Sequence, residues 1–349
     1  MKKFILFASV CFFIIISDLY SQSETKLMSF PNPSSTEITF SYAGDIFTVP
    51  IHGGLARRIT TSAGMELFPR FSPDGKTIAF SGSYDGNYDI YIISNIGGQP
   101  KRLTYGVDIP NLPERMGPDK IIMQWTADGK QILYRGRQDS WNSLVGNLYF
   151  VDTTGRLPKI VELPRAGFSS LSPDGKKLAF NRIFREFRMW KRYSGGQADD
   201  IWIYDFETKK TTKITDNPAQ DIIPMWAGNK IFFLSDRDRT MNLFVYDLNT
   251  NETRKVTNFT EYDVKFPSLG AGNIAFTNGG EIYLLNTTTE KYEKVPVQIA
   301  EDFPLVRTQI VNVKDNIENF KKSPDGKFAL FSARGDIFVV PAEKGNIIN

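Results

Sequence analysis

A short unit built around an Asp-Gly turn recurs along this chain and constrains its fold more than any other feature. The clearest copy runs from Phe71 to Phe80, with Asp74 and Gly75 at the turn, and an apolar run at 89–93 follows it. Glycine accepts the positive φ that a two-residue hairpin needs, so we expect a tight hairpin here. The flanking runs are rich in β-branched and aromatic residues, which is typical of strands.

The same unit returns along the rest of the chain, with turns at Asp128-Gly129, Asp174-Gly175, Gly228-Asn229, Gly272-Asn273 and Asp325-Gly326. A spacing of about 44 to 54 residues is typical of propeller blades or solenoid coils, and four short strands per unit without a helix favour a propeller. The sequence therefore predicts an all-β fold, a six-bladed β-propeller. Its blades are expected at 36–76, 77–130, 131–176, 177–229, 230–273 and 274–312.

The last copy of the unit lies outside these blades. Residues 313–327 read as a linker, and 328–349 contain only two apolar strands, 328–331 and 337–340. Two strands alone neither bury a sheet face nor close a ring. They either pair with the first repeat to close the ring or begin a second, incomplete propeller. The first repeat already has four strands of its own, which favours the second interpretation.

The first 21 residues are typical of an export signal. Lys2 and Lys3 precede an apolar stretch, Phe4 to Ile16, that is short for a membrane span of about 20 residues. We expect cleavage before Gln22, a periplasmic or secreted protein, and no membrane contact afterwards; a retained membrane anchor is the alternative. The one cysteine, Cys11, lies within the signal, so the mature chain would contain no disulfide. A net charge of +3 over 349 residues does not suggest nucleic-acid binding.

Four segments of basic, apolar and threonine residues fall at matching places in their repeats: 57–60, 101–104, 212–215 and 254–257. We interpret them as the third, solvated strands of blades, where Lys and Arg discourage pairing with other chains. A phosphate-binding stripe is the alternative.

The sequence offers little for catalysis. Its one histidine, His52, lies in a turn, and the common nucleophile and phosphate-loop motifs are missing from the sequence. We expect no cofactor and no metal. The loop from Asp85 to Asp89 could hold calcium through its oxygens, but loops of this kind usually satisfy their own backbone. Asp236 and Asp238, interleaved with arginines, are interpreted as a charge network between strands.

An insertion from Arg182 to Arg192 interleaves cationic and aromatic residues. Such a surface suits docking of another domain or subunit, or contact with a peptide carboxylate, and a plain solvated loop is the third interpretation. The candidate contact residues are Arg185, Arg188, Trp190, Lys191 and Arg192.

Three segments carry a family resemblance. Residues 70–91 are similar to the Pro-Asp-Gly repeats of the Tol-system periplasmic protein and of several peptidases, whereas 187–226 and 235–244 resemble the first propeller of tricorn-type serine peptidases. In that family a six-bladed propeller precedes a seven-bladed one, a helical domain, a PDZ domain and a catalytic domain. The resemblance implies that 22–312 is the first propeller and that 328–349 begins the second.

The resemblance also implies a function. The chain would be the non-catalytic propeller portion of an exported tricorn-like peptidase, governing substrate access and assembly, with peptides and the downstream peptidase domains as partners and with homo-oligomers possible in principle. The family anchors the substrate's C-terminus with two arginines in a loop of the second blade; here Arg115 matches one, and Glu114 replaces the other. The alternative is a stand-alone, Tol-system-like propeller that binds another protein.

Overall fold

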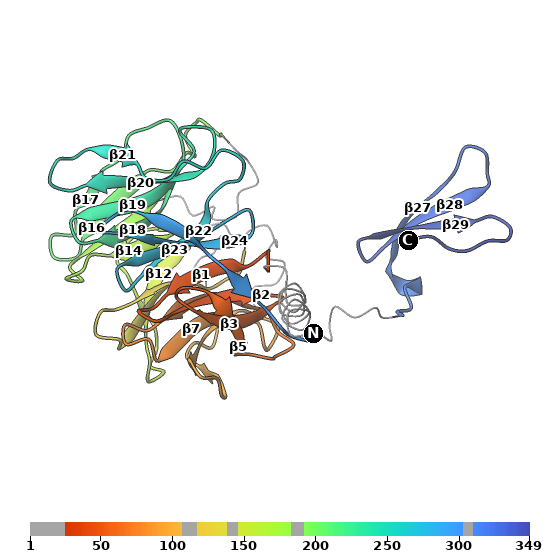
Figure 1. The fold of residues 1–349 in the computed structure, drawn as a ribbon, viewed down its shortest axis with the longest axis horizontal. Helices are drawn as coiled ribbons and strands as arrows, with labels where there is room; N and C mark the ends of the chain where they lie inside the picture. The colour runs from red at the N-terminus through yellow and green to blue at the C-terminus, as the bar shows by residue number, and fades with distance from the viewer. Residues whose placement is uncertain (1–24, 107–116, 138–145, 183–191, 303–309) are drawn as a thin grey trace, which may run out of the picture. The chain divides into compact units, whose positions relative to one another are not determined.

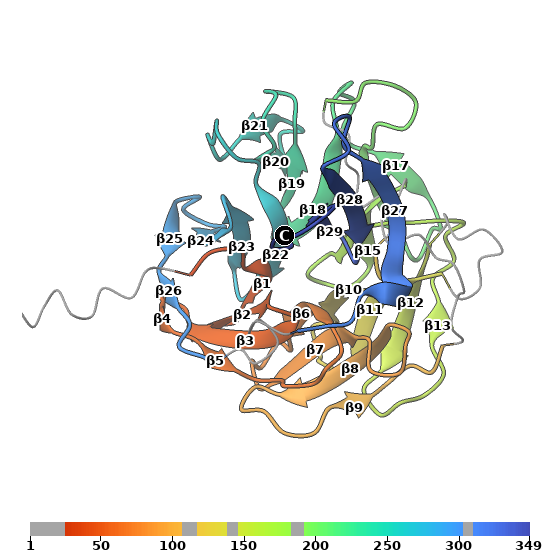
Figure 2. The same cartoon turned by 90° about the vertical axis from the view of Figure 1, so that its right-hand side faces the viewer.

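The computed structural model describes residues 25–106, 117–137, 146–182, 192–302 and 310–349. The chain divides into two compact units, the first ending at Ala300 and the second running from Glu301 to Asn349. The first unit consists of six four-stranded sheets arranged around a central axis (Figures 1 and 2). The prediction of a six-bladed propeller is confirmed. No helix in the described part of the chain is long and apolar enough to cross a membrane.

The first three blades follow one another without exchanging strands, and each is ordered from the inner strand outward. The first contains β1 (Ser29–Pro33), β2 (Glu37–Tyr42), β3 (Asp45–Pro50) and β5 (Arg57–Arg58). The second contains β6 (Glu66–Phe71), β7 (Thr77–Gly82), β8 (Asp89–Ser94) and β9 (Lys101–Arg102). The third contains β10 (Ile121–Trp125), β11 (Gln131–Gly136), β12 (Asn147–Asp152) and β13 (Lys159–Ile160).

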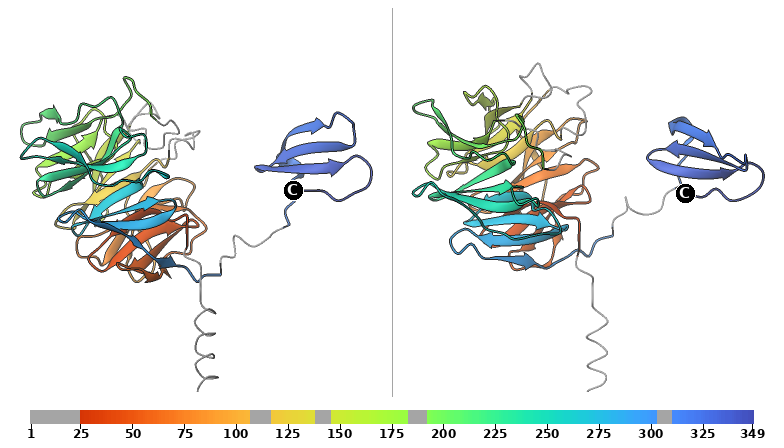
Figure 3. Two further views of the ribbon diagram at one scale, coloured as in Figure 1. Left: turned by 45° about the horizontal axis from the view of Figure 1, so that its top comes forward. Right: turned by 90° about the horizontal axis from the view of Figure 1, so that it is seen from above.

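The other three blades repeat this order. The fourth contains β14 (Ser169–Leu171), β15 (Lys177–Asn181), β16 (Ile201–Asp205) and β17 (Thr211–Lys213). The fifth contains β18 (Asp221–Ala227), β19 (Lys230–Ser235), β20 (Asn242–Asp247) and β21 (Thr253–Lys255). The sixth contains β22 (Lys265–Gly270), β23 (Asn273–Asn278), β24 (Glu281–Asn286) and β25 (Tyr292–Val295). Figure 3 shows these sheets from two further directions.

The blade boundaries differ from those expected. The strand before each turn was assigned to the preceding blade, but Phe71 pairs with Ile78 across the turn, so both strands belong to one sheet. The basic-apolar-threonine segments accordingly contribute fourth strands, or lie at their ends, rather than third strands. The reason is that the turn joins two antiparallel neighbours, while the crossing to the next blade occurs after the outermost strand.

The turn itself is wider than a two-residue hairpin, since residues 72–76 connect β6 and β7. Asp74 Oδ1 accepts hydrogen bonds from Ser72 Oγ at 2.6 Å and from the Lys76 N–H at 3.1 Å. Gly75 has a φ of +70° and donates to the Ser72 carbonyl at 2.9 Å. The Asp side chain thus accepts hydrogen bonds from groups in the turn, in place of the backbone bonds that a tight hairpin would form across the strands. The Ser72 hydroxyl also lowers the pKa of Asp74.

Each blade contains an aromatic pair between its second and third strands. Phe40 lies opposite Phe47, Phe80 opposite Tyr91, and the same register places aromatic residues together in the other four blades, as Tyr134–Tyr149, Phe180–Trp202, Phe233–Phe244 and Phe276–Tyr283. Stacked pairs of this kind contribute about 0.5–1.5 kcal/mol beyond the area they bury. The apolar core lies largely between neighbouring blades, as in the cluster that joins Ala79 and Ile90 to Ile132 and Tyr149.

In each of four blades, a threonine near the outer strand forms a hydrogen bond with the start of the third strand. Thr60 Oγ1 accepts a hydrogen bond from the Ile46 N–H at 2.8 Å, at the start of β3. Three further threonines make the same bond at 2.9 Å, namely Thr104 with Ile90, Thr215 with Ile201, and Thr257 with Leu243. This bond explains why threonine recurs in the basic segments: it satisfies a buried backbone N–H at the strand end.

The ring is closed by chain segments at both ends of the first unit. β26 (Val297–Gln298) pairs in parallel with β4 (Gly54–Leu55), so the chain leaving the sixth blade returns to the first. Gly53 makes this approach possible, because a Cβ at that position would lie 2.3 Å from the Pro296 carbonyl oxygen. The Thr25 N–H also donates to the Val297 carbonyl at 2.9 Å.

The second unit is a three-stranded antiparallel sheet of β27 (Ile317–Lys322), β28 (Phe328–Ala333) and β29 (Asp336–Pro341). A one-turn 3₁₀ helix, η4 (Lys314–Asn316), precedes it. The linker expected at 313–327 therefore contains a strand. The sequence did not reveal this strand, because all residues of β27 are exposed and polar side chains lie on both of its faces, so apolar and polar residues do not alternate.

Candidate functional site: the central channel

The six inner strands place one equivalent residue each around the channel. By register with their second strands these are Asn32, Arg70, Gln124, Ser170, Met225 and Ser268. Five of the six side chains are polar. A row of polar side chains near the axis is unusual for inner strands buried on both sides, and buried polar groups need hydrogen-bond partners.

These side chains find their partners in the neighbouring blades. Asn32 Oδ1 accepts from the Phe71 N–H at 2.8 Å, and Ser170 Oγ donates to Gln124 Oε1 at 2.9 Å. Ser170 Oγ also accepts from the Trp226 N–H at 3.0 Å. The bonds join blade one to two, three to four and four to five, so the inner strands are cross-linked around the ring.

Apolar side chains come together where the inner strands bulge. Phe30, Phe68, Ile223 and Phe266 all have positive φ at a register shift, and a proline follows each of them. The rings of Phe30 and Phe68 lie 4.0 Å apart between centroids, and those of Phe30 and Phe266 lie 4.2 Å apart. Bulky residues rarely adopt this backbone conformation, so its repetition in four blades indicates that the bulge serves to turn these side chains inward.

A cavity of about 940 Å³ opens on the side of the Asp-Gly turns, and we call it the turn-side cavity. Inner-strand ends and turns from all six blades line it, among them Arg70, Trp125, Leu171, Trp226 and Leu269. Arg70, Gln124 and Leu269 also line a space of about 30 Å³ that is bordered by Met123, Phe168 and Ile223. This small space therefore borders the cavity, and its lining mixes polar side chains such as Ser170 with apolar ones.

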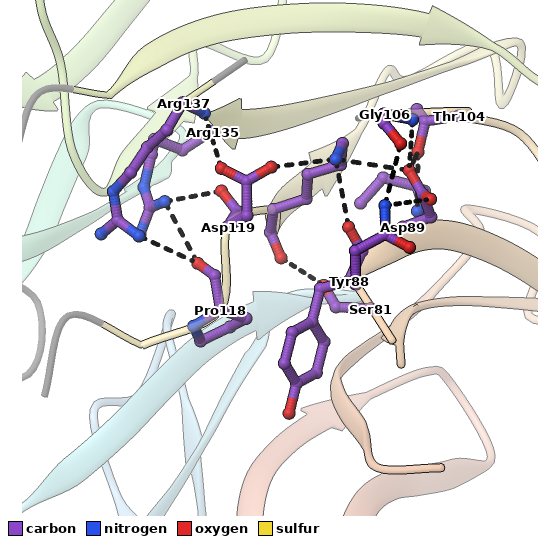
Figure 4. Close-up of polar contacts among 12 residues, drawn as sticks. Ser81, Tyr88, Asp89, Thr104, Gly106, Pro118, Asp119, Arg135 and Arg137 are labelled. Carbon is purple, nitrogen blue, oxygen red and sulfur yellow. Dashed lines mark hydrogen bonds and ion pairs between the residues drawn. The ribbon is translucent and has the colours of Figure 1, made fainter. Parts of the chain in front are cut away.

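At the opposite ends of the strands, a buried ionic network joins the second and third blades (Figure 4). The Lys120 ammonium, 1% exposed, lies 2.9 Å from Asp119 Oδ2 and 3.3 Å from Asp89 Oδ1. It also donates to the Tyr88 carbonyl at 3.1 Å. Arg102 pairs with Asp89 as well. One buried ammonium shared by two carboxylates holds the start of β10 against the start of β8.

The same network fixes residues on both sides of 107–116. On one side the Gly106 N–H donates to Asp89 Oδ1 at 3.2 Å. On the other, the buried Arg135 guanidinium donates to the Asp119 and Pro118 carbonyls at 2.7 and 3.2 Å. The Arg137 N–H donates to Asp119 Oδ1 at 3.1 Å, immediately before 138–145 (Figure 4). Gly106, Asp119 and Arg137, which lie beside these two segments, are thus linked by one set of charged side chains.

Comparison with known proteins places this arrangement in a family. Residues 25–291 match the family described as "Tricorn protease N-terminal beta propeller domain". The chain belongs to this family. It is 27% identical over 327 residues to "Tricorn protease" of Thermoplasma acidophilum, covering 93% of this chain and 30% of that protein. It is 24% identical over 327 residues to "Tricorn protease homolog" of Saccharolobus solfataricus, covering 89% and 28%.

A solved structure supports the same relationship. The structure titled "Crystal structure of the tricorn protease" aligns with a TM-score of 0.72 and 26% identity, covering 93% of this chain and 31% of that one. The chain thus spans about 30% of the length of the curated tricorn relatives named above.

Most of the site residues expected from the sequence of this tricorn-family propeller lie outside the described residues: Arg115, Arg185, Arg188, Trp190 and Lys191. Arg192 is described and exposed. Its backbone N–H donates to Asp236 Oδ2 at 3.1 Å, and its Nε donates to the Arg239 carbonyl at 3.4 Å. The end of the insertion is therefore attached to the connection between β19 and β20 in the fifth blade.

The remaining acidic candidates have partners within the protein. Asp89 is held by Arg102 and Lys120, and Asp85 lies 2.7 Å from Arg102, so cationic side chains already neutralise the loop for which calcium was the alternative to the expected absence of metal. Within the described ranges no three His, Cys, Asp or Glu side chains are grouped as metal ligands would be.

The charge network expected around 236–239 is confirmed. Arg237 Nη2 donates to both oxygens of Asp221 at 2.9 Å, and Lys255 lies 2.9 Å from Asp238. His52 is an exposed turn residue, as expected.

Sequence reasoning missed the channel residues of this propeller. The Pro-containing bulges carry a readable signal, because Phe-Pro or Ile-Pro precedes the first turn of four blades, at 30–31, 68–69, 223–224 and 266–267. The polar residues beside them, such as Arg70, give no signal of their own without the blade register.

Proposed function

We propose that this chain is the non-catalytic propeller portion of a tricorn-type serine peptidase, with a role in substrate access and assembly. The observation that carries the proposal is the family match over 25–291, in a chain that corresponds to about one third of the tricorn protease. The chemistry of the chain agrees with it. Its one histidine is an exposed turn residue, whereas serine hydrolysis needs a positioned base beside the nucleophile.

The geometry supports a role in access. Inner-strand ends and turns from all six blades line one cavity, and a passage bounded in this way would limit the size of a peptide that enters it. The ionic network around Lys120 fixes the residues flanking 107–116, the segment that contains Arg115. We propose that Arg115 contacts the carboxyl end of a peptide. Arg185, Arg188, Trp190, Lys191 and Arg192 are proposed to contact a peptide or another domain.

We further propose that the protein is exported, on the basis of the signal-like residues 1–21. The downstream peptidase domains, in the same polypeptide or in an associated one, are its proposed partners. Self-association into a homo-oligomer is a second proposed contact, and nucleic acid is not a proposed partner.

The test is to purify the protein from its own cells under native conditions and to identify what accompanies it by mass spectrometry. We expect peptides from a serine peptidase with PDZ and catalytic domains, in the periplasmic or secreted fraction. Recovery without any peptidase, together with a different envelope protein, would support a Tol-system-like binding propeller instead. If the peptidase is a separate polypeptide, a variant with Arg185, Arg188 and Lys191 replaced by Ser should lose it, whereas Lys130→Ser on an exposed turn should keep it.

A further inference from the structure

A buried cation lines the turn-side cavity. Arg70 is 7% exposed, and it lines both the large cavity and the small space next to it. Its Nε donates to the Met123 carbonyl at 3.3 Å, and its Nη1 donates to the Pro69 carbonyl at 2.8 Å. These two bonds orient the guanidinium but leave its charge without an acidic counterpart.

Other cations near this cavity are paired. Lys230, which also lines it, lies 2.6 Å from Glu290 Oε1. Among the described residues no carboxylate forms an ion pair with Arg70, and burial alone accounts for the lowering of its pKa to about 10. A buried charge is costly unless an opposite charge accompanies it. Arg70 is therefore a site for an anion, because none of the described side chains supplies a negative charge that pairs with it.

The walls of the cavity indicate which anion fits. Phe71, Trp125, Leu171 and Trp226 line it with apolar surface, and Gln124 adds an amide beside Arg70. A carboxylate matches a planar guanidinium in shape and charge. A phosphate dianion would need a second unpaired cation, which the lining does not offer, because Lys230 is already paired with Glu290.

We propose that the turn-side cavity binds a molecule with one carboxylate next to an apolar group, with the Arg70 guanidinium donating to the carboxylate and the aromatic walls covering the apolar part. The proposal concerns Arg70 and the lining of the turn-side cavity, and it does not involve Arg115, which lies outside the described residues. It follows from the cavity alone and does not depend on the peptidase role.

The experiment uses the full chain and two matched probes, N-acetyl-leucine and N-acetyl-leucinamide, which differ in the carboxylate. Binding is followed by calorimetry and by the fluorescence of Trp125 and Trp226, which line the cavity. We expect the acid to bind at least tenfold more tightly than the amide. Arg70→Gln should weaken binding of the acid at least tenfold and leave the amide unchanged, whereas Arg70→Lys should retain part of the preference. Arg57→Gln, an arginine on the outer strand β5, is the control and should bind like the wild type.

The outcome on the wild-type protein alone is decisive even if Arg70→Gln fails to fold. Equal binding of the acid and the amide would overturn the proposal. So would the absence of acid binding at concentrations up to about 10 mM, which is tenfold above the Kd of about 1 mM that is typical of a weak ligand. Acid binding that Arg57→Gln abolishes and a folded Arg70→Gln retains would overturn it as well.

Discussion

Asn32 Nδ2 in β1 donates a hydrogen bond to Ser268 Oγ in β22 at 2.9 Å, although the two residues are 236 positions apart. The bond joins the first blade to the sixth at the centre of the ring. Asn32 Oδ1 extends the link to the second blade through the Phe71 N–H. One buried side chain therefore connects three blades, and the ring closes here without exchanging a strand between blades.

Replacing Asn32 with Ala should open this junction. The Phe71 N–H would lose its partner in a buried setting, and an unsatisfied buried group costs about 1–3 kcal/mol. The Ser268 hydroxyl would lose the bond from Asn32 and keep the one to the Pro31 carbonyl. We expect the free energy of unfolding to fall by about 2–4 kcal/mol in urea denaturation. Asn249→Ala, in an exposed turn, is the matched control and should change it by less than about 0.5 kcal/mol. Equal effects of the two changes would show that Asn32 does not close the ring.

Glu66 should make the propeller less stable as the pH rises. Burial raises the pKa of Glu66 from its ordinary value of 4.5 to about 8, with an opposing hydrogen bond from Thr60 and a nearby Asp45 carboxyl that raises it further. The folded state therefore retains a proton that the unfolded state releases. The stabilisation that comes from the proton on Glu66 is complete below pH 4.5 and is lost as the pH rises to about 8.

Unfolding free energies measured between pH 5 and 9 would test this. We expect the wild type to lose on the order of 2–4 kcal/mol relative to Glu66→Gln over that range, because the amide has no proton to release. Glu252→Gln, an exposed residue, should follow the wild-type curve. Parallel curves for wild type and Glu66→Gln would mean that this carboxyl is already ionised in the folded protein.

Lys120→Met should be strongly destabilising. The substitution leaves the Asp89 and Asp119 carboxylates buried without the ammonium they share, and breaking one partner out of a buried ion pair costs about 3–5 kcal/mol. Adding Asp119→Asn to Lys120→Met should recover part of the loss. Lys130→Met is the control, since that side chain is 77% exposed and lies 3.9 Å from its acid. Thermal and urea unfolding of the four proteins provide the comparison.

Removing the chain after residue 312 should leave a folded propeller that associates less. All six blades are complete before that point, since β25 ends at Val295. The second unit exposes large apolar side chains, with Phe320 80% and Ile337 61% exposed, on a short sheet that has unpaired edges. Thermal melting and light scattering on both lengths would test the prediction. If the shorter chain unfolds at a temperature where the longer one is stable, the second unit contributes to the ring.

The sequence predicted what repeats and missed what varies between blades. The Asp-Gly and Gly-Asn turns and the aromatic strands indicate the number of blades, because such a turn joins the first two strands of five blades and the same cross-strand aromatic pair occurs in all six. The predicted blade boundaries were wrong by one strand, because a turn motif does not say which of its two strands is innermost. Arg70 and Lys120 could not be recognised, because Arg70 is held by Met123 of the third blade, and Lys120 is shared between its chain neighbour Asp119 and Asp89 of the second blade. Strand β27 was missed because its alternation is masked by polar residues on both faces.

The central claim is that this propeller takes part in peptide degradation without performing the chemistry itself. The most direct measurement is hydrolysis of fluorogenic oligopeptides by the purified chain, compared with Arg70→Gln and Lys130→Met variants purified identically. The account predicts no turnover that belongs to this chain, so any trace activity should be equal in all three proteins and disappear with further purification. Hydrolysis that persists through purification and changes with substitutions in this chain would contradict it.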